Sequence, residues 1–144
     1  MIAGFYPHKG HFNVLRLGRE MLNLGFRDFK IFFRGSHVYK SYVDDIKAEI
    51  IKSGLQDFVI FEPFVKTISL ADIYANFNLV LLLSEYEGFG LPVLEAQSYG
   101  VPVACSRIPI FEEILQESAF YLSPGFSPNE VAGIAKELQS EEKL

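Results

Sequence analysis

Short apolar runs alternate along the chain with longer segments in which apolar residues recur every three or four positions. Apolar runs bounded by turn residues predict β-strands, and the periodic segments predict amphipathic helices. The strands are expected at residues 2–5, 29–35, 58–64, 79–84 and 102–106. The helices are expected at residues 12–24, 39–54, 70–77, 92–100, from 109 onward and at 128–140. This alternation predicts a doubly wound α/β domain with a mostly parallel sheet and helices on both of its faces.

Turn and capping residues set the limits of the predicted helices. Gly25 and Gly54 follow two of them, as glycine does at helix C-termini. Ser69 precedes a third helix as an N-cap, and Pro109 and Pro128 begin two others.

Ligands bind to sheets of this kind at the carboxyl ends of the strands, where loops lead into helix N-termini. The loops at that edge are residues 6–11, 34–37, 62–69, 84–92 and 106–109. The strand before the fourth loop is the most apolar, which predicts a fully buried, central position. Three of these loops contain glycine and two carry a basic side chain beside it, so the edge is suited to an anion.

The stretch SEYEGFGLPVLEA places Glu87 and Glu95 eight residues apart, with Gly88, Gly90 and Pro92 between them. Proline suits a first helical turn, whose free N–H groups favour an anion, and the glycines let a ligand approach the backbone. Carboxylates repel an anion, but they accept hydrogen bonds from hydroxyl groups. A nucleoside diphosphate sugar carries both kinds of group. Glu95 is placed to accept from ribose hydroxyls, and Glu87 to face the sugar.

Lys9 lies in the loop after the first strand, where its ammonium could neutralise a diphosphate. The alternative is an ordinary strand-to-helix turn, with surface glutamates and an exposed lysine that bind nothing. Spacing alone leaves both interpretations open.

Composition narrows the classes of function. The 144 residues are enough for one domain, and a formal charge of −5 without a basic run argues against nucleic-acid binding. The single cysteine, Cys105, cannot form an internal disulfide, which predicts a reducing, intracellular compartment. No apolar run reaches the ~18 residues that a membrane span requires.

Other chemistries find little support in the sequence. His8 and His11 lie three residues apart, but no third ligand has a matching spacing, so no metal site is expected. Ser84 is not part of a Gly-x-Ser-x-Gly turn, and no histidine is positioned to activate Cys105.

Residues 84–115, SEYEGFGLPVLEAQSYGVPVACSRIPIFEEIL, resemble the donor-binding signature of the group 1, glycogen-synthase-like retaining glycosyltransferases, with their Glu-x7-Glu motif at Glu87 and Glu95. The resemblance extends to AFYLSP at 119–124 and to YPHKGH, which is similar to the family's first phosphate-contacting loop. It implies that residues 1–144 form one Rossmann-like donor-binding domain, the C-terminal half of a two-domain GT-B enzyme. The acceptor-binding, N-terminal half lies outside this chain, and the fragment alone is expected to be inactive.

The resemblance implies a role for each matching position. Lys9 would contact the donor diphosphate, Glu87 would bind the transferred sugar as the catalytic residue, and Glu95 would hold the ribose. Phosphate and sugar would also be held by the loop at Gly88, Phe89, Gly90 and Leu91. Residues 64–67 would line the nucleobase, chiefly through the backbone near Val65. Such enzymes transfer a hexose with retention to a glycan or glycolipid acceptor, without a cofactor or a required metal.

One departure from the family pattern opens an alternative. Many members carry arginine directly after the first glycine, where this chain has Phe5, so one cationic phosphate contact is missing. That favours a non-catalytic nucleotide-binding or regulatory α/β module, whereas the Glu87 and Glu95 pair favours the enzyme. Phe5, Tyr6 and Phe12 are expected to form an exposed cluster that faces the missing half. A cytoplasmic location is expected, and a peripheral position at the inner membrane face is left open for the whole enzyme.

Overall fold

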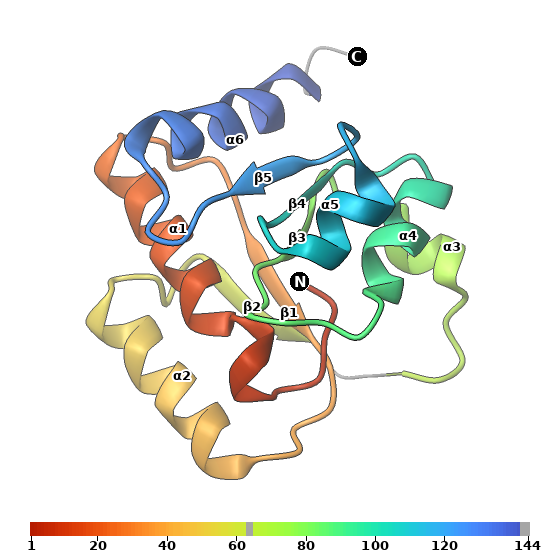
Figure 1. Ribbon diagram of the computed structural model, residues 1–144. Coiled ribbons are helices and arrows are strands. Elements are labelled where there is room, and N and C mark those ends of the chain that lie inside the picture. Colours follow the sequence, from red (N-terminus) through yellow and green to blue (C-terminus); the bar gives the residue numbers. More distant parts are fainter. Residues whose placement is uncertain (63–64, 142–144) are drawn as a thin grey trace.

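The computed structural model describes residues 1–62 and 65–141, which fold into parallel strands separated by helices (Figure 1). A 3₁₀ turn, η1 (Pro7–Lys9), precedes the first helix. The strands are β1 (Ile31–Arg34), β2 (Val59–Glu62), β3 (Val80–Leu82), β4 (Val103–Ser106) and β5 (Phe120–Leu122). The helices are α1 (His11–Asn23), α2 (Lys40–Lys52), α3 (Leu70–Tyr74), α4 (Leu91–Ser98), α5 (Pro109–Leu115) and α6 (Pro128–Glu141). The predicted alternation of strands and helices is confirmed.

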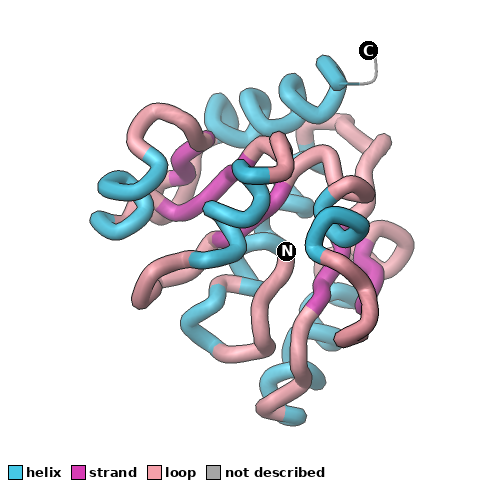
Figure 2. The backbone as a smooth tube through the Cα atoms, turned by 90° about the vertical axis from the view of Figure 1, so that its right-hand side faces the viewer, coloured by secondary structure: helices cyan, strands magenta, loops and turns pink. Residues whose placement is uncertain are grey.

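The strands form two parallel groups. β1 pairs with β2, and β4 lies between β3 and β5. Figure 2 shows these groups as separate strand segments, with the N-terminus between them. Every strand pair is parallel, so the strand ends that lead into α4 and α5 lie at the same edge.

The expected strand at residues 2–5 is reduced to a single bridge between Ile2 and Arg34. Met1 and Ala3 exchange backbone hydrogen bonds with Arg34, at 3.0 and 2.9 Å. The chain then turns, because the Tyr6 N–H donates to the Gly4 carbonyl. The Phe5 N–H still donates to the Ser36 carbonyl at 3.0 Å, so the segment runs beside β1 without forming a continuous strand.

The sequence also failed to predict β5 as a strand. It is only three residues long, and its first residue, Phe120, is exposed. A run this short carries neither the length nor the alternation that identifies a strand.

The core occupies both faces of the central strand. Val103, Ala104 and Cys105 follow one another in β4 and are all fully buried, which requires cover on both sides of the sheet. In Figure 1 the strands lie between α1 and α2 on one side and α3 and α4 on the other. The prediction of helices on both faces is thereby confirmed.

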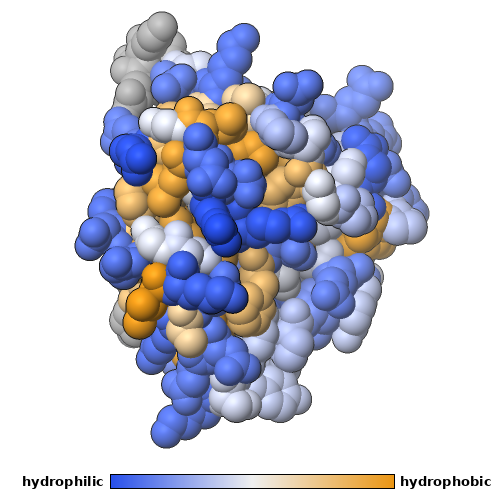
Figure 3. All heavy atoms as spheres, turned by 90° about the vertical axis from the view of Figure 1, so that its left-hand side faces the viewer, coloured by the Kyte–Doolittle hydropathy of each residue, from blue (hydrophilic) through white to orange (hydrophobic). Residues whose placement is uncertain are grey.

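The surface over α1 and α2 is mostly hydrophilic, with apolar areas between the charged side chains (Figure 3). Phe12 of α1, Leu24 just after its end and Ile51 of α2 are among the exposed apolar side chains of these segments. Scattered apolar residues of this kind are normal on a solvent-facing surface.

Phe5 lies in the core and is fully buried, so the expectation that it faces a missing half was wrong. Its ring stacks on His11 at 4.5 Å and on Phe61 at 5.7 Å between centroids. These neighbouring rings cover the surface of the Phe5 ring, which explains why an apolar residue occupies the position.

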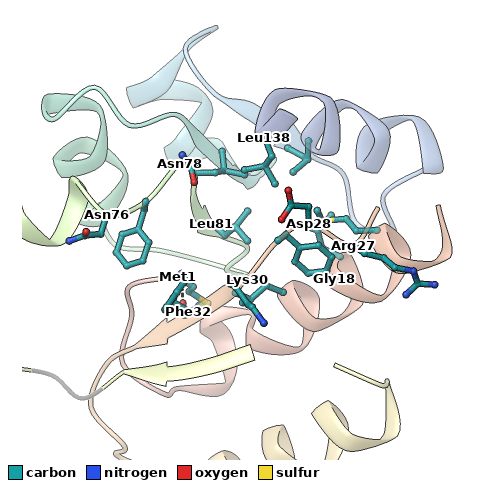
Figure 4. A pocket seen from close by; sticks show the side chains of 17 residues that line it. Met1, Gly18, Arg27, Asp28, Lys30, Phe32, Asn76, Asn78, Leu81 and Leu138 are labelled. Atoms are coloured by element: carbon teal, nitrogen blue, oxygen red, sulfur yellow. Dashed lines mark hydrogen bonds between the residues drawn. The ribbon is translucent and has the colours of Figure 1, made fainter. Parts of the chain in front are cut away.

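A cavity of about 400 Å³ lies at the amino ends of the strands (Figure 4). Met1, Phe32 and Leu81 line it, together with Leu138 of α6. None of the site residues predicted from the sequence borders this cavity. It therefore lies at the opposite edge from the loops that were expected to bind a ligand.

Candidate functional site

The first loop is held against the end of β3. The Glu85 N–H donates to the His8 carbonyl at 2.8 Å, and Asn13 Nδ2 donates to the Leu83 carbonyl at 3.2 Å. Gly10 makes this approach possible. It has a φ of 79°, and a Cβ atom there would lie 1.8 Å from the Leu83 carbonyl oxygen. The loops at residues 6–11 and 84–92, which are distant along the chain, therefore lie together and form one rim.

Lys9 and Glu87 meet across this rim. The Lys9 Nζ lies 2.8 Å from Oε1 and 2.9 Å from Oε2 of Glu87, although the two residues are 78 positions apart. The Ser84 hydroxyl donates to the same Oε1 at 2.7 Å. The Lys9 side chain is 23% exposed and that of Glu87 only 6%. The structure therefore brings together the predicted phosphate contact and the predicted catalytic residue as one ion pair.

The backbone after Glu87 opens toward solvent and begins α4. Gly88, Phe89 and Leu91 are exposed, and no side chain caps the helix at Gly90. Gly90 has a φ of 78°, and a Cβ atom there would lie 2.5 Å from the Phe111 ring. Pro92 has no N–H, and the Val93 N–H donates to the Gly90 carbonyl at 3.1 Å. In the described structure the N–H groups of Gly90 and Leu91 have no partner, which suits an anion at this helix start.

Glu95 lies one turn into α4 and is oriented by Tyr74. The Tyr74 hydroxyl donates to Glu95 Oε2 at 2.8 Å and also approaches the Pro92 carbonyl at 3.3 Å. Burial, and then the hydrogen bond to Glu95, raise the pKa of Tyr74, so the hydroxyl remains a donor. The sequence did not reveal this partner, because Tyr74 at the end of α3 looks like any core aromatic residue.

Val65 is exposed in the loop after β2, and its carbonyl accepts from the Ile68 N–H at 3.5 Å. Within the part of the chain that the structure describes, no hydrogen bond connects Val65 to Lys9, Glu87 or Glu95. Phe64, which the sequence also placed at the nucleobase, lies outside the described residues. The nucleobase assignment stays a prediction.

A hollow of about 420 Å³ opens next to the ion pair, at the carboxyl ends of β3, β4 and β5. Ser84 and Glu85 line it from one side, and Ser106 and Arg107 from another. Because Ser84 also contacts Glu87, the hollow and the ion pair share a wall.

Neither histidine of the first loop is placed as a metal ligand. His11 is buried, its Nε2 has no hydrogen-bond partner among the described residues, and burial lowers its pKa to about 3. His8 stacks on Tyr86 at 4.5 Å. Within residues 1–62 and 65–141, no group of three His, Cys, Asp or Glu side chains is arranged to hold a metal ion.

The structure also bears on the membrane question. Among the helices that it describes, none has both the length and the apolar character needed to cross a bilayer.

Comparison with known proteins adds a family to this geometry. The family model described as glycosyl transferases group 1 matches residues 1–144. The serotype-specific mannosyltransferase WbdA of Escherichia coli is 32% identical over 140 residues, which cover 95% of this chain and 16% of WbdA. The O-antigen chain mannosyltransferase B of Escherichia coli is 31% identical over 104 residues, covering 72% of this chain and 27% of that protein. The chain thus spans well under a third of each relative.

A solved structure shows the same fold. Anabaena Alr3699/HepE, determined in complex with UDP-glucose, matches with a TM-score of 0.83 at 21% sequence identity. The match covers 99% of this chain and 38% of that one. The arrangement of parallel strands and helices is therefore a known one that occupies part of a longer protein.

Proposed function

The chain belongs to the group 1 glycosyl transferases, as one half of their GT-B fold, and on that premise we propose that it binds the nucleoside diphosphate sugar of a retaining glycosyltransferase. The transferred group is a hexose, and the acceptor is a glycan or glycolipid. Mannose is the favoured hexose, because WbdA and the O-antigen chain mannosyltransferase B are both mannosyltransferases. The whole enzyme acts in the cytoplasm, and its other half binds the acceptor.

The observation that carries the proposal is the Lys9 and Glu87 pair beside the uncapped start of α4. A cation and a carboxylate meet on this rim, and α4 begins at Leu91, four residues after that carboxylate. A diphosphate requires the cation and the N–H groups at the start of α4, and a sugar hydroxyl requires the carboxylate.

We assign the roles as follows. The donor diphosphate takes the place of Glu87 as the partner of Lys9, and it also receives N–H groups from the start of α4. Glu87, released from Lys9 but still held by Ser84, accepts hydrogen bonds from hydroxyls of the transferred sugar. Glu95, oriented by Tyr74, accepts from the ribose.

The chemistry of transfer then depends on stabilising the departing diphosphate. Charge that develops on the leaving group is stabilised by Lys9 and by the N–H groups of α4, which are in place before the reaction. Phe5, at the position where many family members carry arginine, has an uncharged ring that is buried in the core. Lys9 is the cation to which we assign leaving-group stabilisation, and Arg16 and Arg107 line the neighbouring hollow.

Nucleotide binding tests the proposal directly. Titration of the chain with UDP, GDP and ADP by calorimetry or NMR is expected to show binding of one of them with a dissociation constant near millimolar, equivalent to about 4 kcal/mol. Lys9→Ala and Glu95→Ala should each weaken binding about tenfold, because hydrogen bonds to charged groups contribute about 1.5–3 kcal/mol. Lys136→Ala, an exposed lysine on α6, is the control and should bind as the original chain does. If all variants bind the nucleotide with equal affinity, the nucleotide does not bind at this rim.

Tyr74→Phe tests whether Glu95 acts as an oriented acceptor. The variant keeps the ring that stacks on Tyr99 at 5.6 Å but removes the hydroxyl that donates to Glu95. Nucleotide affinity should fall about threefold, since one net hydrogen bond contributes about 0.5–1.5 kcal/mol. Tyr121→Phe removes a hydroxyl that donates to the Gln116 and Phe111 carbonyls and not to Glu87 or Glu95, so it should leave affinity unchanged. If the two variants bind alike, the Tyr74 hydroxyl does not position Glu95 for the ligand.

The buried Phe5 specifically favours a second candidate, a module that binds a nucleotide but does not catalyse transfer. The two functions separate in the full-length protein. The enzyme consumes the nucleotide sugar in the presence of acceptor, whereas the module binds it and leaves it intact.

A further inference from the structure

Two donors hold the Glu87 carboxylate, and they differ in their freedom to move. The Lys9 ammonium lies 2.8 and 2.9 Å from its two oxygens, and the Ser84 hydroxyl lies 2.7 Å from Oε1. Lys9 reaches across from another loop on a long, flexible stem, and its side chain is 23% exposed. Ser84 has a short side chain and is only 1% exposed. The lysine is therefore able to leave the carboxylate, whereas the serine stays beside it.

Hydrogen bonds of its neighbours fix the backbone on both sides of Ser84. The Leu83 carbonyl before it accepts from Asn13 Nδ2 at 3.2 Å. The Glu85 N–H after it donates to the His8 carbonyl at 2.8 Å. Both bonds are made to the segment that contains the first loop and the start of α1, so they do not depend on where the Lys9 side chain lies.

The Ser84 hydroxyl has a single proton to donate, and two acceptors lie near it. Glu87 Oε1 is 2.7 Å from Ser84 Oγ, and the Lys9 carbonyl oxygen is 3.4 Å away. The shorter distance and the negative charge both favour the carboxylate as the acceptor. Ser84 thus makes one charge-assisted hydrogen bond to Glu87 from a fixed position.

This bond becomes decisive when a donor binds and takes Lys9 away. The Glu87 side chain is only 6% exposed, and a buried carboxylate without any donor is strongly destabilised. With a nucleotide sugar bound, hydroxyls of the sugar and of Ser84 both satisfy Glu87. With a nucleotide alone, the Ser84 hydroxyl is the donor that remains to it in the described structure.

We propose that Ser84 is a positioning residue for the transfer reaction. It keeps the Glu87 carboxylate in place and hydrogen-bonded while Lys9 moves to the diphosphate, so that Glu87 meets the sugar already oriented. The inference rests on the proposed function and assigns Ser84 no contact with the ligand, because its hydroxyl is directed to Glu87. Loss of the hydroxyl must therefore penalise the nucleotide complex more than the nucleotide sugar complex.

The relative affinity of these two ligands tests the proposal. The chain is titrated by NMR with UDP, GDP and ADP, and then with the α-D-mannose ester of the nucleotide that binds. Ser84→Ala should weaken the nucleotide about tenfold and the ester about threefold or less, because sugar hydroxyls still donate to Glu87 in the second complex. The ratio of the two dissociation constants should thus change about threefold. A merely structural role, such as support of the loop, would weaken both ligands by the same factor.

Ser53→Ala is the matched control. Ser53 donates to Glu49 Oε1 at 2.7 Å, and Glu49 lies 3.9 Å from the Lys52 ammonium, so the same three residue types meet at the end of α2. This variant should bind both ligands as the original chain does.

A double-mutant cycle shows whether Ser84 acts through Glu87. In a Glu87→Ala chain there is no carboxylate to hold, so adding Ser84→Ala should change neither affinity further. If Ser84→Ala does not fold, Ser84→Cys takes its place. It replaces the hydroxyl by a thiol, a weaker donor, and should change the ratio of affinities in the same direction by a smaller factor.

The outcomes separate this proposal from the function on which it rests. If the original chain binds a nucleotide and its ester, but the serine variants weaken both equally or not at all, Ser84 does not position Glu87 and the donor site stands. An undiminished effect of Ser84→Ala in the Glu87→Ala chain would also refute the proposal. If the original chain binds neither ligand, the proposed function falls, and the role of Ser84 falls with it.

Discussion

Replacing Gly10 with alanine is expected to lower the free energy of unfolding by more than about 3 kcal/mol, a loss outside the usual range for a single substitution. The positive φ of 79° alone costs a residue with a side chain about 1–2 kcal/mol. The new Cβ would also lie 1.8 Å from the Leu83 carbonyl oxygen, a distance that real contacts never reach. The first loop must therefore leave the end of β3, which separates Lys9 from Glu87.

Gly25→Ala is the matched control for this substitution. Gly25 has a similar φ of 84°, but no atom lies within 4 Å of its would-be Cβ. The control should lose only about 1 kcal/mol, the cost of the strained backbone. Urea unfolding of the two variants measures the difference. Equal losses would mean that the contact between the first loop and β3 contributes nothing to stability.

The second large effect is a loss of stability in mild acid. Burial, followed by the positive charges of the chain amino group and Lys9, lowers the pKa of His11 from 6.5 to about 3. Above pH 6.5 the imidazole is neutral in the folded and the unfolded chain, so it costs nothing. Between pH 6.5 and 3 only the unfolded chain takes up the proton. The free energy of unfolding therefore falls, by about 3 kcal/mol at pH 4.5 from this residue.

His11→Phe isolates that contribution. Its ring replaces one that lies 4.5 Å from Phe5 and 5.2 Å from Phe33. The substitution removes Nε2, which has no hydrogen-bond partner among the described residues, and Nδ1, which lies 3.4 Å from the Tyr42 hydroxyl. Overpacking by the larger ring shifts stability equally at every pH, so the slope remains informative. The amino group of Met1, whose pKa burial lowers to about 5, contributes equally to both proteins and cancels in the comparison. Unfolding curves at pH 7.5 and 4.5 should show a loss about 3 kcal/mol smaller in the variant; parallel losses would exclude His11 as the cause.

Local signals predicted most of the fold. The amphipathic period of α1 and its end near Gly25 depend on neighbouring residues, and so does the cap that Ser69 provides for α3 through the Asp72 N–H at 3.1 Å. The predictions that failed concern segments whose structure depends on residues distant in the sequence. Residues 2–5 run beside β1 with a single bridge at Ile2, and the short β5 is a strand because β4 lies beside it.

The candidate site likewise has features that the sequence predicted and contacts that it did not. The pattern around Glu87 and Glu95, with the glycines between them, marked the loop and the helix start from sequence alone. The contacts that orient these carboxylates were not predictable, because Lys9, Ser84 and Tyr74 reach them only after folding. The interior position of Phe5 was missed for the same reason, because the rings that cover it, His11 and Phe61, belong to other elements.

In the proposed donor site, one ammonium is shared between two anions, and this sharing has a consequence for the turnover that we propose. With the intact donor bound, Lys9 serves the diphosphate and Glu87 is satisfied by the sugar. Once the sugar has been transferred, the nucleoside diphosphate still occupies Lys9, but Glu87 keeps only the Ser84 hydroxyl as a partner while only 6% exposed. A buried carboxylate that lacks hydrogen-bond donors raises the free energy of that product complex. Return of Lys9 to Glu87 favours release of the spent nucleotide, so the ion pair of the empty site opposes product inhibition.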